Sequence, residues 1–458
     1  MCKLVAFDLL NERRQSSGRT IVVVVRLSPL GILVAGAMLP LPATAAPPIT
    51  VERAVDMALA RAPEVRAARG EHAAVGERVR QARSAYLPRL SLNGGYMVWW
   101  PKNALELPAG VPIELPAIDS YHHVNAGLEA GIRLVDLSRG ARVDAARQAA
   151  SAAGAGIRET EVGLAFQVRA TFLAALFSRD VTRIAGESSK LARRQEQQAR
   201  LRAEVGTGSQ VALAQTRVRG AQLEAQLRQS ESELERYRRQ LASLVGLPPG
   251  RLPSLEGDLE LLSRPVPSRQ VEQNPTLVKL RASREAALLT AKSTARSLVP
   301  TLDLFAKAEV EYPHRMKVEW GPLIQGGLRL SWPFFEGGVR WSRLREARAR
   351  SEGLQAAEQA AREKLARRLI DLGARARTAE ADLTSARATQ KQTEVYLRVA
   401  RAAVAAGTGT DLDVHQAELG VDQTRIAVRK ALLALAVVRA ETLAVCGITS
   451  SSRKGGNR

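Results

Sequence analysis

The residues of this 458-residue chain that could do chemistry are few and widely spaced. Gly206-Thr207-Gly208 resembles part of a phosphate loop, but no Lys-Ser/Thr ending follows it and a helical pattern precedes it. The sequence has no His-Glu-x-x-His motif, no Cys-x-x-Cys motif and no nucleophile elbow, and its five histidines include only one adjacent pair. Its two cysteines cannot form a disulfide framework. We therefore expect no catalytic residue, no metal site and no cofactor, so the chain is not expected to be an enzyme.

The charge balance is strongly basic. The chain has 67 Lys and Arg against 46 Asp and Glu, which gives a net charge of +21. Such a balance suits nucleic acid, an anionic membrane surface or acidic cargo. Because the basic residues are spread along helical segments and no platform of aromatic and basic residues occurs, we expect no nucleic-acid partner.

The first 45 residues have the features of a signal peptide. An apolar run from Leu27 to Leu41 follows Arg26, and Ala43-Thr44-Ala45 is a cleavage pattern that would leave Ala46 first. The long segment before Arg26 would be explained by an overextended start. No cysteine stands directly after the cleavage pattern, so a lipid anchor is not expected. No later run is long and apolar enough to predict a transmembrane helix, so any contact with a membrane would require strands.

Two long runs without proline dominate the chain. They cover residues 139–204 and 209–247 and are rich in Ala, Leu, Arg, Gln and Glu, with apolar residues at helical spacing. A helix over the first run would be about 100 Å long, far beyond the helices of ordinary globular domains. The glycines of the break at 205–208 predict a chain reversal. The sequence therefore predicts a very long antiparallel helical hairpin.

Alternation with a period of two predicts four strands, at 90–100, 124–134, 302–312 and 324–332, each with one apolar and one polar face. Of the 18 aromatic residues, 12 fall within 86–135 or 298–341, as in the girdles of a lipid-embedded barrel. The commoner alternative is a strand pair on a soluble core, but no other segment offers a core for four such strands. The predicted girdle consists of Tyr96, Trp99, Trp100, Tyr121, Tyr312, Trp320 and Trp332.

The second half of the chain repeats the first. Asn274-Pro275 matches Ala62-Pro63 and 298–302 matches 86–90, both displaced by about 212 residues, whereas the later glycine turns are displaced by about 201. Four matches in the same order indicate a tandem duplication. The expected divisions are a signal peptide (1–45), a first repeat (46–247), a Pro-rich connector (248–271), a second repeat (272–448) and a disordered tail (449–458).

Four strands of about ten residues can cross a bilayer, but a closed barrel needs about eight or more strands. Several copies must therefore share one barrel, and three copies would supply twelve strands. The predicted fold class is mainly α with a membrane β-barrel: duplicated long helical hairpins and four strands per protomer, with a trimeric twelve-stranded barrel on a helical barrel.

These motifs and their order resemble the TolC outer-membrane factor family over nearly all of the mature chain. The resemblance rests on 49–55 with Pro63, on 86–88, on 332–340 and on the two Gly-Thr-Gly turns. It implies a homotrimer in the bacterial outer membrane that extends into the periplasm. The implied partners are outer-membrane lipid, a periplasmic adaptor (membrane fusion protein), an inner-membrane ABC or proton-driven transporter, and a protein or small-molecule cargo.

The resemblance also implies two sites at the ends of the hairpins. Asp413 matches an aspartate that lines the closed entrance in the family, whereas Gln416 stands where a second acid is found. Gly409 and Ala212 replace an arginine and an aspartate that help to hold that entrance shut. The alternatives are that the turns only reverse the helices and that an acid early in a helix only favours the helix dipole. The implied docking tips are Val205, Gly206, Thr207 and Gly208 with Ala406, Gly407, Thr408 and Gly409, and the implied periplasmic entrance is Asp411, Asp413 and Gln416.

Three functions remain open at this point. The basic charge favours type I secretion of a large acidic protein or toxin, because a basic duct attracts such cargo. The alternative within the same class is the outer-membrane component of a drug or small-molecule efflux pump. A periplasmic coiled-coil adaptor or scaffold, from a different class, would explain the hairpins but not the four two-faced strands.

Overall fold

The structure is a computed structural model that describes residues 47–100, 122–248, 250–263, 271–314 and 317–449. These residues belong to one compact unit. The predicted signal peptide, the loop 101–121 with Tyr121, parts of the connector and the tail from 450 onward lie outside the described residues.

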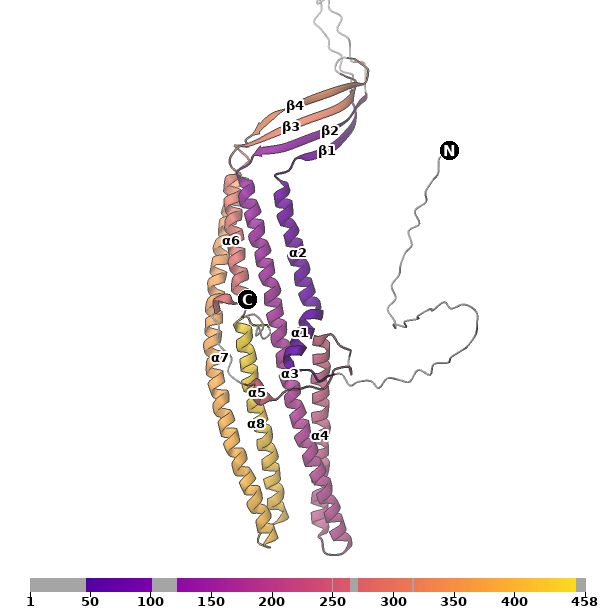
Figure 1. The fold of residues 1–458 in the computed structure, drawn as a ribbon, viewed down its shortest axis with the longest axis vertical. Helices are drawn as coiled ribbons and strands as arrows, with labels where there is room; N and C mark the ends of the chain where they lie inside the picture. Colours follow the sequence, from indigo (N-terminus) through magenta and orange to yellow (C-terminus); the bar gives the residue numbers. More distant parts are fainter. Residues whose placement is uncertain (1–46, 101–121, 249, 264–270, 315–316, 450–458) are drawn as a thin grey trace, which may run out of the picture. The chain divides into compact units, whose positions relative to one another are not determined.

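Two long helical hairpins and one antiparallel sheet make up the described chain (Figure 1). The first half contains α1 (Val51–Arg61), α2 (Pro63–Ser84), β1 (Arg89–Val98), β2 (His122–Val135), α3 (Ser138–Glu204) and α4 (Gln210–Val245). The second half contains α5 (Leu259–Leu262), η1 (Val271–Gln273), α6 (Pro275–Arg296), β3 (Thr301–Tyr312), β4 (Gly321–Ser331), α7 (Val339–Ala405) and α8 (Asp411–Val445). Both α2 and α6 have 22 residues, and both α3 and α7 have 67, as the predicted duplication requires.

Capping residues explain where the shorter helices begin. Thr50 accepts a hydrogen bond from the backbone N–H of Arg53 and thereby satisfies a donor in the first turn of α1. Pro63 and Pro275 each occupy the start of a helix, where a missing N–H costs nothing. In the second copy Asn274 also caps the helix by accepting from the N–H of Thr276. Helix α1 therefore ends at Arg61, and α2 begins at Pro63.

The four strands pair in the order β1-β2-β3-β4, and every pair is antiparallel. The pairing of β2 with β3 joins the two halves of the chain, with Val124 opposite Tyr312. A bulge at Arg133/Val135 interrupts this register next to the start of α3. Within the described chain, β1 and β4 each pair on one side only, so the sheet has two open edges.

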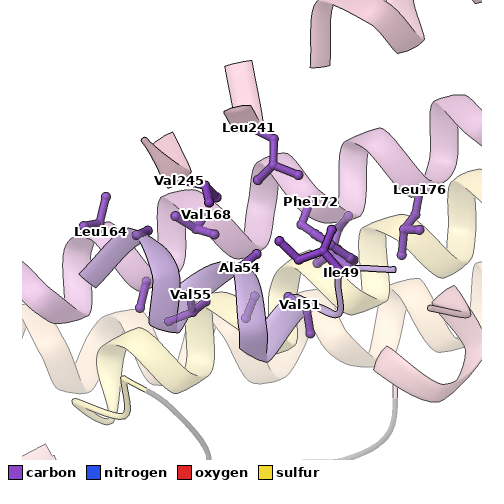
Figure 2. Close-up of a cluster of buried hydrophobic side chains, with 14 of the residues drawn as sticks. Ile49, Val51, Ala54, Val55, Leu164, Val168, Phe172, Leu176, Leu241 and Val245 are labelled. Carbon is purple, nitrogen blue, oxygen red and sulfur yellow. The ribbon is translucent and has the colours of Figure 1, made fainter. Parts of the chain in front are cut away.

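The largest hydrophobic core forms where α1 packs on the α3/α4 hairpin and α8 packs against α3 (Figure 2). Val55 of α1, Phe172 and Leu176 of α3, Leu241 of α4 and Leu432 of α8 are almost completely buried there. Helix α3 contacts α1, α2, α4, α6 and α8, and therefore holds the two copies together. Away from this cluster, α7 has few buried residues for its length.

The sequence predicted no helix long and apolar enough to cross a membrane after the signal peptide, and α3 departs from that expectation. Within the described residues, α3 is a helix long and apolar enough to cross a membrane by length and composition, with a mean hydropathy of 1.2 over its most apolar window. However, 56% of that window is buried inside the protein. Since α3 contacts α1, α2, α4, α5, α6 and α8, its apolar residues serve as a protein core.

Two leucines of α3 provide a matched test of this core. Leu176 is 0% exposed, whereas Leu201 is 55% exposed. We expect Leu176→Ala to lower the free energy of unfolding by about 2–5 kcal/mol, because the substitution leaves a cavity. Leu201→Ala should change it by only about 0.5 kcal/mol. Urea unfolding followed by circular dichroism measures both, and equal losses would contradict the assignment of the core.

Candidate functional site

The sheet has one apolar face and one polar face, and the register keeps them apart across all four strands. Residues that pair across strands lie on the same face of the sheet, as Leu92, Leu128 and Ala308 do on the apolar face. The apolar face is open: Leu92 is 78% exposed and Ile324 is 80% exposed. A soluble protein rarely leaves so many neighbouring apolar side chains uncovered, so this face requires an apolar surrounding.

The opposite face carries polar and charged pairs between and along the strands. Lys307 Nζ lies 2.7 Å from Glu309 Oε2, and Asn125 donates to the same carboxylate over 3.3 Å. Nearer the helices, Arg133 Nε donates to Asp303 over 2.9 Å. In a membrane strand of this kind, the polar side faces the interior of a barrel.

The predicted aromatic residues lie at both ends of the strands. Tyr96 and Tyr312 are neighbours of Val124 in the register, and Trp320 packs against Tyr312 with ring centroids 5.4 Å apart. Trp99, just beyond β1, stacks on His123 at the same end, while Trp100 is the next residue along the chain. Trp332 lies at the other end, after β4, and donates to the carbonyl of Leu298. Five of the six described residues therefore gather at the end away from the helices, with Trp332 alone at the helical end. The girdle role remains a prediction.

The two predicted docking tips have nearly the same geometry. Gly206 and Gly407 both have φ of +78°, which favours glycine. Thr207 bonds through its N–H and hydroxyl to the carbonyl of Arg202, and Thr408 bonds in the same way to Ala403. Val205 is exposed at its tip, and so are Gly206, Thr207, Ala406, Gly407 and Thr408, whereas Gly208 and Gly409 are less open. These bonds account for the helix reversal, and adaptor docking remains a prediction.

The predicted entrance residues differ in what they contact. Asp413 forms a capping box with Thr410, accepting from its hydroxyl over 2.6 Å and from its backbone N–H over 2.9 Å. The hydrogen bond from the hydroxyl and that from the N–H lower the pKa of Asp413. Asp411 and Gln416 are exposed. Asp411 also lines a cavity of about 420 Å³ between the two tips, which includes Arg202 of the first hairpin.

A buried carboxylate joins the hairpins near these tips, and the sequence analysis did not predict it. Glu418 on α8 is 6% exposed and accepts hydrogen bonds from Gln195, Arg219 and Arg401, which belong to α3, α4 and α7. Burial alone would raise the pKa of Glu418, but the hydrogen bonds from Gln195 and Arg401 outweigh it and lower the pKa. Its position beside Ala417 in the buried stripe of α8 is the signal that could have revealed it.

A second buried contact joins α3 to α8 one turn further along. Ser188 donates to Asp422, and burial raises the pKa of that carboxyl. Together with the contact of Gln195 with Glu418, this pair places polar contacts between α3 of the first hairpin and α8 of the second. Within the described residues, no cluster of His, Cys, Asp and Glu has the arrangement of a metal site.

An exposed apolar sheet face carried on long helical hairpins defines a membrane-inserted protomer. The family model described as outer membrane efflux protein matches residues 54–247 and 266–442, so the chain belongs to this family. It is therefore an outer-membrane protein that extends into the periplasm, and the family is one of channels and not of enzymes.

Solved structures share the fold. CusC aligns with a TM-score of 0.74 and 17% identity, covering 87% of this chain and 92% of that one. VceC of Vibrio cholerae aligns with a TM-score of 0.71 and 18% identity, covering 87% and 97%. These TolC-like proteins are trimeric outer-membrane channels with a helical barrel and a β-barrel. The resemblance and the fold class predicted from the sequence are therefore confirmed.

A curated relative is the fusaric acid resistance protein FusA of Burkholderia cepacia, which is 26% identical over 303 residues. The match covers 63% of this chain and 56% of the length of that protein. The chain therefore spans little more than half of the curated relative that it matches.

His415 provides a test of pH dependence at the joined hairpins. Burial is the largest cause that lowers the pKa of His415, and the charge of Arg219 lowers it further. Glu418 and Asp411 raise the pKa, but by less. Since the folded protein binds this proton less readily than the unfolded chain, stability should be unaffected well above pH about 6.5 and should fall as the pH drops below it. We expect His415→Gln to reduce the loss of stability between pH 7.5 and pH 5.

Thermal unfolding of the wild type and of His415→Gln at both pH values measures this difference. His72→Gln is the matched control, because this histidine is exposed and lies on α2. An unchanged pH dependence in His415→Gln would contradict the assignment of the proton to this histidine.

Proposed function

We propose that the chain is the outer-membrane duct of a tripartite export system and works as a homotrimer. The observation that carries this proposal is the exposed apolar face of a sheet whose edges β1 and β4 are unpaired within the protomer. Three protomers with four strands each would pair these edges and close a twelve-stranded barrel. The barrel would present the apolar face to lipid and the polar face to the lumen.

The helical part supplies the periplasmic half of this duct. Three copies of the α3/α4 and α7/α8 hairpins would surround a tunnel that begins at the two Gly-Thr-Gly turns. A periplasmic adaptor would dock on these turns, and an inner-membrane transporter would deliver the cargo. In this proposal, residues 1–45 direct export, 46–247 and 272–448 are the two repeats, and 248–271 connects them.

Small toxic molecules are the cargo that the comparisons favour. The family description refers to efflux, and FusA is described by resistance to fusaric acid. Type I secretion of a large acidic protein is the second candidate, and its support is the net charge of +21. Both candidates need the same duct but differ in the transporter that would feed it.

Deletion of the gene separates the two candidates. We expect the deletion strain to become more sensitive to small toxic compounds, because intracellular levels rise when the exit is lost. Protein secretion should be unchanged. Minimum inhibitory concentrations and the secreted proteome of the two strains measure these effects. Loss of one large acidic secreted protein with unchanged sensitivities would instead support type I secretion.

The tips provide a test of docking. We expect Gly206→Val combined with Gly407→Val to reduce export by about tenfold or more, since a β-branched side chain strains both turns at φ of +78°. Trimers should still reach the outer membrane, because the tips lie outside the main hydrophobic core. Compound accumulation in cells and trimer content in outer-membrane fractions measure the two effects.

Gly70→Val combined with Gly353→Val is the matched control for the tip variants. A Cβ at either of these helical glycines meets nothing within 4 Å, and neither has a positive φ. Export at the wild-type level in the tip variant would exclude a docking role for the two turns.

A further inference from the structure

A cavity of about 350 Å³ lies where the polar face of the sheet meets the first turn of α3. Its size falls within the range of small-molecule sites. Arg89, Arg133 and Arg329 line it from the sheet, and Arg139 lines it from α3. In the proposed duct this cavity would open to the lumen at the helical end of the barrel.

Five arginines and three carboxylates line the cavity. Of the carboxylates, Glu129 accepts a hydrogen bond from Asn93 over 3.4 Å, and the other two are paired with arginine. Arg133 uses Asp303 over 2.9 Å and Asp136 over 3.4 Å, and Asp136 also accepts hydrogen bonds from Ser138. In the part of the chain that the structure describes, no carboxylate lies within ion-pair distance of Arg89 or Arg329. Positive charge is therefore left over on the cavity wall.

Arg139 adds a buried donor to this wall. The side chain is 6% exposed, and its two terminal nitrogens donate to the carbonyls of Ala85 and Leu134 over 3.0 and 3.1 Å. The Nε atom is buried and has no hydrogen-bond partner. The guanidinium also lies over the Tyr86 ring, 4.6 Å from its centroid. These contacts hold Arg139 in place and add its positive charge to the cavity wall.

The start of α3 is already capped by an acid and adds nothing to this preference. The Asp136 carboxylate accepts from the backbone N–H of Ser138, the first residue of α3, over 2.9 Å. The preference for an anion therefore rests on the arginines of the cavity wall.

The cavity also has apolar walls beside its positive groups. The Arg329 guanidinium lies over the Phe305 ring, 4.6 Å from its centroid, and Leu87 lines the same cavity. A guanidinium recognises a carboxylate through paired N–H donors, and an apolar wall accommodates a ring. We propose that this cavity binds the carboxylate of a small aromatic acid, a proposal that rests on the function proposed above and specifies a class of cargo.

Binding of benzoate to the purified full-length protein tests this site. We expect calorimetry to detect benzoate binding, with benzamide and acetate weaker by about tenfold, since the first lacks the charge and the second lacks the ring. Arg329→Gln should weaken benzoate binding about tenfold or more. Arg345→Gln, an exposed arginine on α7, is the matched control and should bind as the wild type does.

Arg89→Gln serves as a second variant if Arg329→Gln does not fold, with circular dichroism as the check. Equal binding of benzoate and benzamide, or binding unaffected by both variants, would overturn the proposal. These measurements need no transport, so they can fail while the deletion strain still shows loss of efflux. Conversely, a deletion strain with normal efflux would refute the function even if benzoate binds.

Discussion

Backbone polar groups cannot remain unpaired in lipid, and the rest of this structure depends on that constraint. The apolar face with Leu92 and Ile324 favours lipid, but β1 and β4 leave open edges that lipid cannot satisfy. The same strands have a polar face with Lys307 and Glu309 in contact, which excludes burial of both faces in lipid. Closure with other protomers satisfies the edges and separates the faces at once.

The long helices have apolar residues that no single partner helix can bury. A 67-residue helix cannot be covered by one partner of 36 residues, so α3 packs against α4 for part of its length and against α1 and α2 elsewhere. The buried cluster around Phe172 forms where α1, α4 and α8 converge on α3. Outside that region the hairpins are joined by polar contacts, of which Glu418 with Arg219 and Arg401 is the most buried.

Polar side chains near the hairpin ends cap helices and join neighbouring helices, and their sequence position does not reveal these contacts. Asp413 was expected at the entrance because of a resemblance, and its side chain is engaged in the capping box with Thr410. Glu418, four residues after Val414, carries more of the contact between hairpins than any of the three expected entrance residues. The entrance assigned by resemblance remains a prediction for the assembled trimer, where other protomers adjoin these side chains.

Local patterns in the sequence determined the long helices, the four two-faced strands and the duplication, because periodicity acts over a few residues. They also predicted the turn at Gly206, where a positive φ favours glycine. Only the tertiary structure brought Glu418 to Arg219 and Arg401, and Arg139 to the cavity with Arg329. Glu418 lies 199 residues from Arg219 in the chain, and Arg139 and Arg329 belong to different repeats. Their proximity depends on how the helices and strands pack, which local patterns do not encode.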